Sequence, residues 1–488
     1  MGYNREKVLR ENIEAIRLAL NLEKEGRTAS ASEKEILGRY KGFGRCWSIL
    51  RQDPVRIWPI GERKLFPLVE ELWQVIDTVQ DQYRKEAIIA SLKRSVETSE
   101  ETPRDMILSI GRGLLKGMRL EKETSLRLLD PASLSGNFLG LFEDHVLQGL
   151  SKTAYATDIL SGMIQKTLHP EIDVRSSGFE CFPSSEKGSF DLVISHIPSG
   201  EMSVDDPLYS SGNAMERASL DRIDSYFFLK GLDALREGGV LCFITDMRLL
   251  NDVGERPTRQ YLMERSNLIT AVPLPRNAFY SVSGTEMDHA LVILQKNSQK
   301  RTLTEKERFF TESVEIDYQK MDELMDELHR QHPKYSDRLH CPNRYVEDWL
   351  RSEEKSCHNF WVEPYVDTDE EGVLSIHYSS YMYEDFSDLC PGEESGLEEL
   401  VRLEMEARFQ PELLQRNEAR GPLNVLGEEL LSLPQLFNLP EDEKVWREMN
   451  AKGKRSGFGS DKDHGKVSNP SSEMNTTEKV ERKGRGRR

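Results

Sequence analysis

Across residues 103–298, short apolar runs alternate with segments of helical periodicity. Several of the segments between these runs are long enough for crossover helices, and Asp221–Arg236 is the clearest of them. Strands that alternate with helices predict a parallel, doubly wound α/β sheet. Residues 275–289, between the last two runs, have no helical pattern, so the final strand is predicted to be antiparallel. The seven predicted strands are Leu126–Leu129, Thr153–Ala156, Ile172–Val174, Phe190–Ser195, Val240–Thr245, Leu268–Leu274 and Ala290–Gln295.

Residues 1–102 are predicted to form an N-terminal helical region. Apolar residues recur at helical spacing from residue 3 to residue 24, with charged residues between them. Similar patterns continue at Glu33–Arg39 and Pro67–Val96. We expect these apolar stripes to serve ordinary packing between helices.

Two regions of different composition follow the predicted sheet. Residues 299–440 contain charged helical segments at Asp317–Arg330 and Ser395–Gln410 on either side of a segment rich in Tyr and Asp, and they are predicted to form an α+β extension. From Lys452 the chain is rich in Lys, Arg, Gly, Ser and Asn and has almost no apolar residue. Residues 441–488 are therefore predicted to be a disordered basic tail.

The composition limits the classes of protein to consider. No apolar run approaches the ~20 residues that a membrane helix needs, so no membrane partner is expected. The N-terminal sequence also lacks the apolar core of a signal peptide. Six cysteines are scattered without a CxxC pair, which is typical of a reducing compartment and argues against a metal site. A cytoplasmic location is expected.

The charge of the chain is unevenly distributed. Lys and Arg outnumber Asp and Glu by eleven to five in residues 451–488, so this tail carries +6 of the net charge of −18 and the rest of the chain carries −24. A body this acidic does not attract DNA through its overall field. Any DNA contact therefore needs a local basic patch, the tail, or a partner protein.

Candidate ligand residues follow the first three predicted strands, because an open parallel sheet binds ligands at the carboxyl ends of its strands. Asp130, Pro131 and Gly136 follow the first strand, in a turn that either approaches a ligand or simply leads into a helix. Asp158 follows the second strand and could bind ribose hydroxyls or cap a helix. Glu180 follows the third, either beside an adenine ring with the preceding aromatic residue or in a surface loop.

The fourth strand runs into a tight polar loop. Phe190–Ile194 reads as buried strand, and Ser195-His196-Ile197-Pro198-Ser199 follows it directly. The loop therefore lies at the same edge of the predicted sheet as the other candidate residues.

Read in order, these elements resemble the N6-adenine DNA methyltransferases, and more closely the large N6-DNA methylases of bacterial conjugative elements and phages. The resemblance covers about residues 4–410. Its pieces are Asn12-Ile13-Glu14-Ala15-Ile16-Arg17, Tyr40-Lys41-Gly42-Phe43-Gly44, Thr102-Pro103, Phe190–Pro198, Tyr226–Leu232 with Leu235–Gly239, Gly284-Thr285-Glu286-Met287-Asp288 and Leu291–Lys296.

The resemblance implies a class I, Rossmann-like methyltransferase domain at residues 103–298 that binds S-adenosylmethionine. It also implies that an adenine flipped out of DNA enters beside the loop after the fourth strand, where an Asn and the next carbonyl hold its amino group and an aromatic ring stacks on it. By this resemblance the target loop is His196, Ile197, Pro198 and Ser199, and the cofactor residues are Thr102, Pro103, Asp130, Pro131, Gly136, Asp158, Glu180 and Asp191.

Four residues depart from the family pattern at positions that touch ligands. His196 stands at the Asn position and Ser199 at the aromatic position of the target loop. Leu134 stands where the cofactor loop normally has Gly, and Ala156 where the family usually has a ribose-binding Glu. This pattern is typical of an active site that has degenerated while the packing residues remain.

Three hypotheses follow from the sequence. The chain is an active methyltransferase with an altered pocket, or a non-catalytic methylase-fold protein that serves as a DNA-binding, specificity or regulatory subunit on a mobile element. In the third, residues 300–440 and the basic tail form a protein-interaction module and the central fold is a scaffold.

Overall fold

The computed structural model describes residues 3–99, 101–119, 126–140, 151–284, 286–311, 313–314, 330, 356–357, 362–368, 374–380 and 396–418. Apart from Arg330, the helix expected at Asp317–Arg330 lies outside the described residues, and so does the basic tail. None of the described helices is long and apolar enough to cross a membrane.

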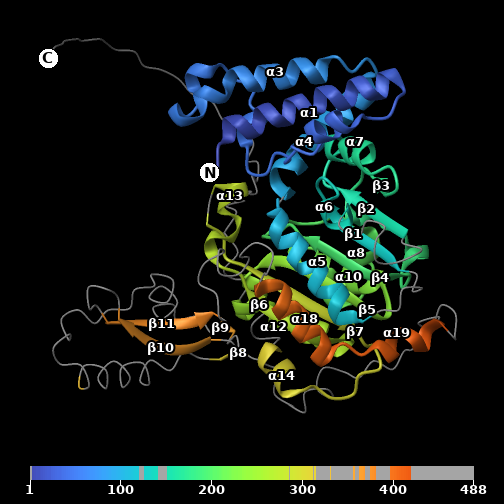
Figure 1. Cartoon of the computed structure of the whole chain (residues 1–488), viewed down its shortest axis with the longest axis vertical. Coiled ribbons are helices and arrows are strands. Elements are labelled where there is room, and N and C mark those ends of the chain that lie inside the picture. Colours follow the sequence, from blue (N-terminus) through green and yellow to red (C-terminus); the bar gives the residue numbers. More distant parts are fainter. Residues whose placement is uncertain are drawn as a thin grey trace, which may run out of the picture.

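A seven-stranded mixed sheet forms the centre of the molecule, in the order β3-β2-β1-β4-β5-β7-β6 (Figure 1). The first five strands are parallel, and β7 is antiparallel to both of its neighbours, β5 and β6. All seven predicted strands and the reversed last strand are therefore confirmed, and the fold is the Rossmann-like α/β fold of the class I type. The strands are β1 (Arg127–Ser133), β2 (Ser151–Ala156), β3 (Asp173–Arg175), β4 (Phe190–His196), β5 (Leu235–Asp246), β6 (Ser266–Pro273) and β7 (His289–Lys296).

Both faces of the sheet are covered, as expected for largely parallel strands. Successive residues of one strand enter different cores: Leu192 and Ile194 of β4 pack with α5 (Arg104–Met118), whereas Val193 packs with α10 (Ile223–Ala234). The α10 helix confirms the crossover expected at Asp221–Arg236. The other described helices on or around the sheet are α6 (Asn137–Gly140), α7 (Ile159–Leu168), α8 (Pro207–Ser210), α9 (Ala214–Ser219), α11 (Arg248–Asn251), α12 (Arg256–Arg265), α13 (Tyr280–Ser283), α14 (Glu305–Thr311) and α19 (Pro411–Glu418).

One core contains a helix from far along the chain. Helix α18 (Gly396–Arg408), expected from its sequence pattern, packs against α5 and adds Leu400 and Val401 to the core of the sheet (Figure 1). The approach is close because a Cβ atom at Gly113 of α5 would lie 2.7 Å from the Val401 Cβ atom. The described residues after residue 311 also include the short strands β8 (Ser313–Val314), β9 (Ser356–Cys357), β10 (Val362–Thr368) and β11 (Leu374–Ser380).

The N-terminal helices form a separate layer above the sheet in the view of Figure 1. The layer comprises α1 (Arg5–Glu25), α2 (Ala31–Leu37), α3 (Phe66–Asp77) and α4 (Gln82–Thr98), with a core of its own. The helical stretch predicted at Pro67–Val96 is two helices, because Asp81 caps the start of α4 through the Tyr83 and Arg84 amides. The core of this layer also contains Leu134, from the loop after β1. The N-terminal layer therefore rests on the carboxyl edge of the sheet.

Candidate functional site

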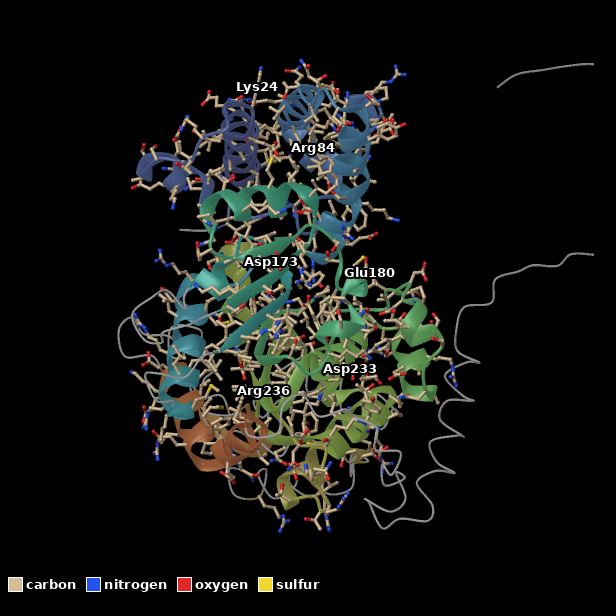
Figure 2. The ribbon with its side chains drawn as sticks, turned by 90° about the vertical axis from the view of Figure 1, so that its right-hand side faces the viewer. Lys24, Arg84, Asp173, Glu180, Asp233 and Arg236 are labelled. Carbon is tan, nitrogen blue, oxygen red and sulfur yellow. The ribbon has the colours of Figure 1, made fainter. Side chains whose placement is uncertain are left out.

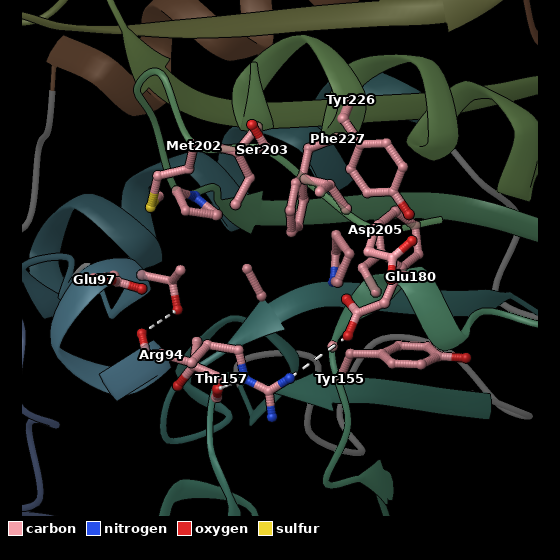
Figure 3. A pocket seen from close by; sticks show the side chains of 18 of the residues that line it. Arg94, Glu97, Tyr155, Thr157, Glu180, Met202, Ser203, Asp205, Tyr226 and Phe227 are labelled. Atoms are coloured by element: carbon pink, nitrogen blue, oxygen red, sulfur yellow. Dashed lines mark hydrogen bonds and ion pairs between the residues drawn. The ribbon is translucent and has the colours of Figure 1, made fainter. Parts of the chain in front are cut away.

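A cavity of about 430 Å³ lies at the carboxyl ends of β1, β2 and β4 (Figure 3). Its volume is in the range of small-molecule sites. Helix α4 of the N-terminal layer and helix α10 complete its wall. It is lined by Arg94, Glu97, Thr98, Pro131, Ala132, Tyr155, Ala156, Thr157, Gly178, Phe179, Glu180, Pro198, Met202, Ser203, Val204, Asp205, Ile223, Tyr226 and Phe227.

Aromatic side chains form one wall of this cavity. The ring centroid of Phe179 is 5.4 Å from that of Phe227 and 5.7 Å from that of Tyr155. Pro131, near the end of β1, and Pro198, from the loop after β4, add apolar surface. A mostly apolar cavity with few polar groups is typical of a site that binds a flat ring.

A buried ion pair holds this aromatic wall from behind. Lys230 and Asp206 are both about 1% exposed, and the Lys230 Nζ atom is 2.5 Å from the Asp206 Oδ2 atom. The Tyr226 hydroxyl donates to the same carboxylate at 2.7 Å, and Lys230 also donates to the Glu180 carbonyl at 3.2 Å. Burial raises the pKa of Asp206, but the hydrogen bonds from Lys230 and Tyr226 outweigh it and lower that pKa. The network therefore connects the loop after β3 to α10.

The polar centre of the cavity is an ion pair between the two layers. Arg94 reaches down from α4, and its Nη1 atom lies 3.6 Å from the Glu180 Oε1 atom. Its Nε atom donates to the Thr157 carbonyl at 2.8 Å, at the end of β2. Figure 3 shows both side chains directed into the cavity. A donor and an acceptor thus lie side by side at the strand ends.

The other part of the strand edge is closed. A space of only about 20 Å³ remains among Thr102, Asp130, Leu134, His196 and their neighbours. Leu134 is 8% exposed and fills this region from the loop after β1. Its side chain lies so close to the N-terminal layer that a Cβ atom at Gly42 would be 2.5 Å from the Leu134 Cδ1 atom.

His196, at the end of β4, forms part of this closed region. Its Nδ1 atom is 2.9 Å from the Thr102 hydroxyl, and its ring lies edge-on to His289 at a centroid distance of 5.1 Å and 5.0 Å from Phe279. Its Nε2 atom and both ring nitrogens of His289 have no hydrogen-bond partner among the described residues. Burial lowers the pKa of His196 well below its ordinary value and lowers that of His289 to about 4, so both rings are neutral near pH 7.

Two carboxyl groups border the same closed region, the buried Asp130 and the partly buried Glu101. Burial raises the pKa of Asp130 to about 6, although the Ser195 hydroxyl donates to Asp130 at 2.6 Å. Burial raises the pKa of Glu101 to about 7, against the effect of Lys41 at 3.4 Å. Both acids and His196 line the same small space. The region thus holds buried polar groups of which several, including Glu101 Oε2 and His196 Nε2, have no hydrogen-bond partner among the described residues.

Seven of the expected site residues come to this edge. Pro131, Glu180 and Pro198 line the larger cavity, and Thr102, Asp130 and His196 border the closed region. Pro103 follows Thr102 as the residue preceding α5.

Other expected residues serve the protein itself. Asp158 caps α7 by accepting hydrogen bonds from the Leu160 and Ser161 amides, so of the two roles expected for it the structure shows the helix cap. Gly136 adopts a positive φ of 80° and faces α7, because a Cβ atom there would lie 2.8 Å from Gln165. Ile197 is fully buried, and its amide donates to the Ile244 carbonyl. Ser199 is half-buried in the loop and does not line the larger cavity.

Asp191 lies at the opposite edge of the sheet from the site. It is near the amino end of β4, accepts a hydrogen bond from the Arg127 amide at 2.7 Å and pairs with Arg236. Figure 2 shows Glu180 near the junction of the two layers and Arg236 far below it. A parallel strand presents its two ends at opposite edges, so Asp191 stabilises the sheet there instead of lining the cofactor region.

Sequence reasoning missed Arg94 and Lys230. Arg94 is one charged residue among many on an amphipathic helix, and nothing in the sequence sets it apart. Lys230 interrupts the apolar run Tyr226–Leu232, and a charge within a buried helix is a signal of a paired group. That signal could have found the Lys230–Asp206 pair.

The resemblance implies S-adenosylmethionine, and the residues fit only part of this molecule. The aromatic wall and Glu180 have the chemistry for the adenine ring. At the position where the resemblance implies a ribose-binding carboxylate stands Ala156. The resemblance also implies that the methionine portion lies along the loop after β1, and Leu134 from this loop fills the small space there. The complete cofactor therefore does not fit this arrangement of side chains.

No family model matches the chain. Over 193 residues it is 28% identical to Defense against restriction protein B of Escherichia phage P1, a match that covers 38% of this chain but only 8% of the phage protein. A class I S-adenosylmethionine-dependent methyltransferase described from Listeria monocytogenes shares 15% identity, with a TM-score of 0.38 over 61% of this chain and 91% of that one. The type I restriction-modification methyltransferase subunit of Streptococcus thermophilus shares 12% identity, with a TM-score of 0.35 over 60% and 79% of the two chains. None of these similarities assigns the chain to a family, and its fold class rests on its own strand order.

Proposed function

We propose that the chain is a methylase-fold protein of a mobile element that no longer transfers methyl groups and acts as a non-catalytic, DNA-associated subunit. One observation carries the proposal. The part of the strand edge where an N6-adenine methylase would bring the methyl group and the target base together is filled by Leu134 and His196.

The chemistry of the target loop supports this proposal. Transfer to an adenine amino group requires an acceptor that holds this group, and a ring that stacks on the base. His196 is engaged with Thr102 and packed against Phe279 and His289, and Ser199 offers no ring. Loss of base stacking alone costs ~1–3 kcal/mol of binding.

The mobile-element part of the proposal rests on the phage P1 relative, which is named for defence against restriction. We extend this role to the present chain, which would associate with the DNA of a mobile element and help to protect it from restriction. Because residues 451–488 carry +6 while the remainder carries −24, the tail is the proposed DNA contact, and a protein partner would bind through the region after residue 299.

A methyl-transfer assay tests the loss of activity. The purified chain is incubated with methyl-labelled S-adenosylmethionine and unmethylated DNA, beside an active adenine methylase. We expect no label in DNA above background. The pair His196→Asn and Ser199→Phe should not restore transfer, because Leu134 and Ala156 remain. Label incorporated by the unmodified chain would favour an active enzyme with an altered pocket and refute the proposal.

Removal of residues 452–488 tests the DNA contact. We expect weaker DNA binding and a flatter dependence of log K on log salt, by about 0.9 for each phosphate that the tail neutralises in the intact chain. The matched control keeps the length of the tail and replaces its Lys and Arg residues with Gln. An unchanged salt dependence in both variants would show that the tail does not contact DNA.

A further inference from the structure

We infer that a groove on the N-terminal layer is the docking site of the chain's own basic segment, residues 479–488. The groove has a volume of about 470 Å³ and is lined by side chains from residues 51–58 and from helix α3. Figure 1 shows α3 on the side of the N-terminal layer that faces away from the sheet, so the groove is separate from the cavity at the strand ends. The inference goes beyond the proposed function, because it gives the basic tail a binding surface within the same chain.

Three aromatic rings, those of Trp58, Phe66 and Trp73, give this groove an apolar surface. The Trp58 and Phe66 rings meet edge to face with their centroids 5.4 Å apart. The indole N–H groups of Trp58 and Trp73 donate to the Asp53 and Ile49 carbonyls, each at 3.1 Å. The rings are therefore fixed before any ligand arrives, which lowers the cost of binding.

Exposed apolar side chains belong to the same stretch of chain. Three of the seven large apolar side chains that are exposed in the described part of the chain lie within residues 47–60. They are Trp47, Ile57 and Ile60, and Ile60 is 83% exposed. Large apolar side chains gathered in one exposed region typically mark a surface that another segment covers.

Acidic side chains give the groove a negative charge. Asp53, Glu70 and Asp77 line it together with one cationic residue, Arg51. Arg51 pairs with Asp53 at 3.4 Å, and Lys85 pairs with Asp77 at 2.5 Å. Glu70 is exposed and has no ion pair among the described residues. The groove therefore favours a cationic ligand with groups that pack on aromatic rings.

Arginine side chains have this chemistry, because a guanidinium group stacks on an aromatic ring and pairs with a carboxylate. The groove already contains one example, since the Arg51 guanidinium carbon lies 5.9 Å from the centroid of the Trp58 ring. Residues 479–488 lie outside the described residues, and their sequence supplies further arginines. They contain six Lys or Arg residues and one Glu, a net +5 of the +6 in residues 451–488.

The length of the intervening chain allows this contact. Helix α19 ends at Glu418, and residues 419–478 comprise 60 residues. An extended chain of this length spans up to ~200 Å. The basic segment can therefore reach the N-terminal layer of its own chain.

Calorimetric titration with a synthetic peptide of residues 479–488 tests the docking. The peptide is added to the unmodified chain and to a full-length Gln-tail variant, in which the six Lys and Arg residues of this segment are replaced by Gln. We expect the peptide to bind the Gln-tail variant, and to bind the unmodified chain at least tenfold more weakly, because a tethered segment competes at an effective concentration near millimolar. No binding to the Gln-tail variant at millimolar peptide, or equal binding to both chains, would overturn the inference.

Substitutions in the Gln-tail variant connect the binding to the groove. Glu70→Gln and Trp73→Leu should each weaken peptide binding about threefold or more. Glu35→Gln is the matched control, because it removes an exposed carboxylate from α2 in the same layer that does not line the groove. Glu70 is exposed, so its variant decides the matter even if Trp73→Leu fails to fold. An equal loss in Glu35→Gln would assign the attraction to the overall negative charge and refute the groove.

The concentration of the chain distinguishes its own segment from that of a second copy. The apparent affinity of the peptide for the unmodified chain should stay constant when the chain concentration rises tenfold. Weaker binding at the higher concentration would assign the groove to the segment of a second copy and overturn docking within one chain. The salt dependence of DNA binding decides whether the tail contacts DNA, so the proposed function and this docking can fail separately.

Discussion

At the carboxyl edge of the sheet, an open cavity lies next to a region that side chains fill almost completely. The region beside β2 and α10 keeps a cavity of about 430 Å³, and the region beside Leu134 and His196 keeps about 20 Å³. Both are lined by residues from the end of β1, and Ala132 borders both of them. The two regions differ because different side chains from the N-terminal layer and from the sheet domain pack against this edge.

The open region is supported from within the sheet domain, whereas the closed region is filled where the N-terminal layer meets the sheet. Lys230 and Asp206 hold the aromatic wall from behind, and Leu134 belongs to the core of the N-terminal helices. The same layer supplies Arg94 to the open region. One packing arrangement thus fills one part of the strand edge and adds a polar group to the other part. The predictions below test whether the two regions are as independent as this comparison implies.

The largest effect is expected from Lys230→Ala, which leaves Asp206 buried without its cation. Breaking one partner of a buried pair typically costs about 3–5 kcal/mol, and the free energy of unfolding from urea titration should fall by this amount. Lys230→Met combined with Asp206→Leu leaves no uncompensated charge and should recover most of the loss. A fall of less than about 1 kcal/mol in the single variant would show that the pair does not support the open region.

The closed region should make stability depend on pH. The folded pKa of His289, about 4, lies below its unfolded value of ~6.5, so the unfolded state binds more protons between these values. The contribution of His289 is therefore complete above pH ~6.5 and is lost as the pH falls towards 4, by at most about 3 kcal/mol. The pKa values of Glu101 and Asp130 are raised in the folded state, so these two groups increase the free energy of unfolding as the pH falls.

Variants separate these opposing contributions in urea titrations at pH 7 and pH 4. His289→Phe should reduce the loss of stability on acidification, and Glu101→Gln should increase it, because a carboxyl group with a raised pKa stabilises the fold as the pH falls. Parallel profiles for both variants and the unmodified chain would contradict this assignment of buried charges.

A smaller effect is expected from Leu134→Ala, which removes the side chain that fills the closed region. The loss in unfolding free energy should be about 2–3 kcal/mol, at the low end for a buried Leu, since the site is at the edge of a core. If the two regions are independent, the losses from Leu134→Ala and Lys230→Ala should add to within about 0.5 kcal/mol in the double variant. A larger departure from additivity would break the comparison and show that Leu134 is coupled to the open region.

The strands were predictable because each is a short apolar run that enters a buried sheet. The first and last residues of the strands were harder to predict. For example, β5 begins at Leu235 instead of Val240, because polar residues such as Arg236 can extend a strand at the edge of the core. Reasoning from strand ends also predicted that Glu180 and His196 lie at the carboxyl edge of the sheet, where the structure has them. The same reasoning could not predict that Leu134 fills one region or that Arg94 enters the other. Both positions depend on where the N-terminal layer packs on the sheet, and no local sequence pattern encodes this packing.

The smallest effect on stability, and the finest test of the open region, is expected from Gly178→Ala. Gly178 has a φ of −72°, so Ala is not strained there, but its Cβ atom would collide with the Glu180 carboxylate. The end of a flexible side chain can move aside, so the unfolding free energy should change by less than about 1 kcal/mol. Gly61→Ala, at a glycine whose added Cβ atom meets no other atom within 4 Å, is the matched control and should change the unfolding free energy no more than Gly178→Ala does. A loss of more than about 1 kcal/mol in Gly178→Ala alone would mean that the Glu180 carboxylate cannot move aside, and that its position beside Arg94 stabilises the junction of the two layers.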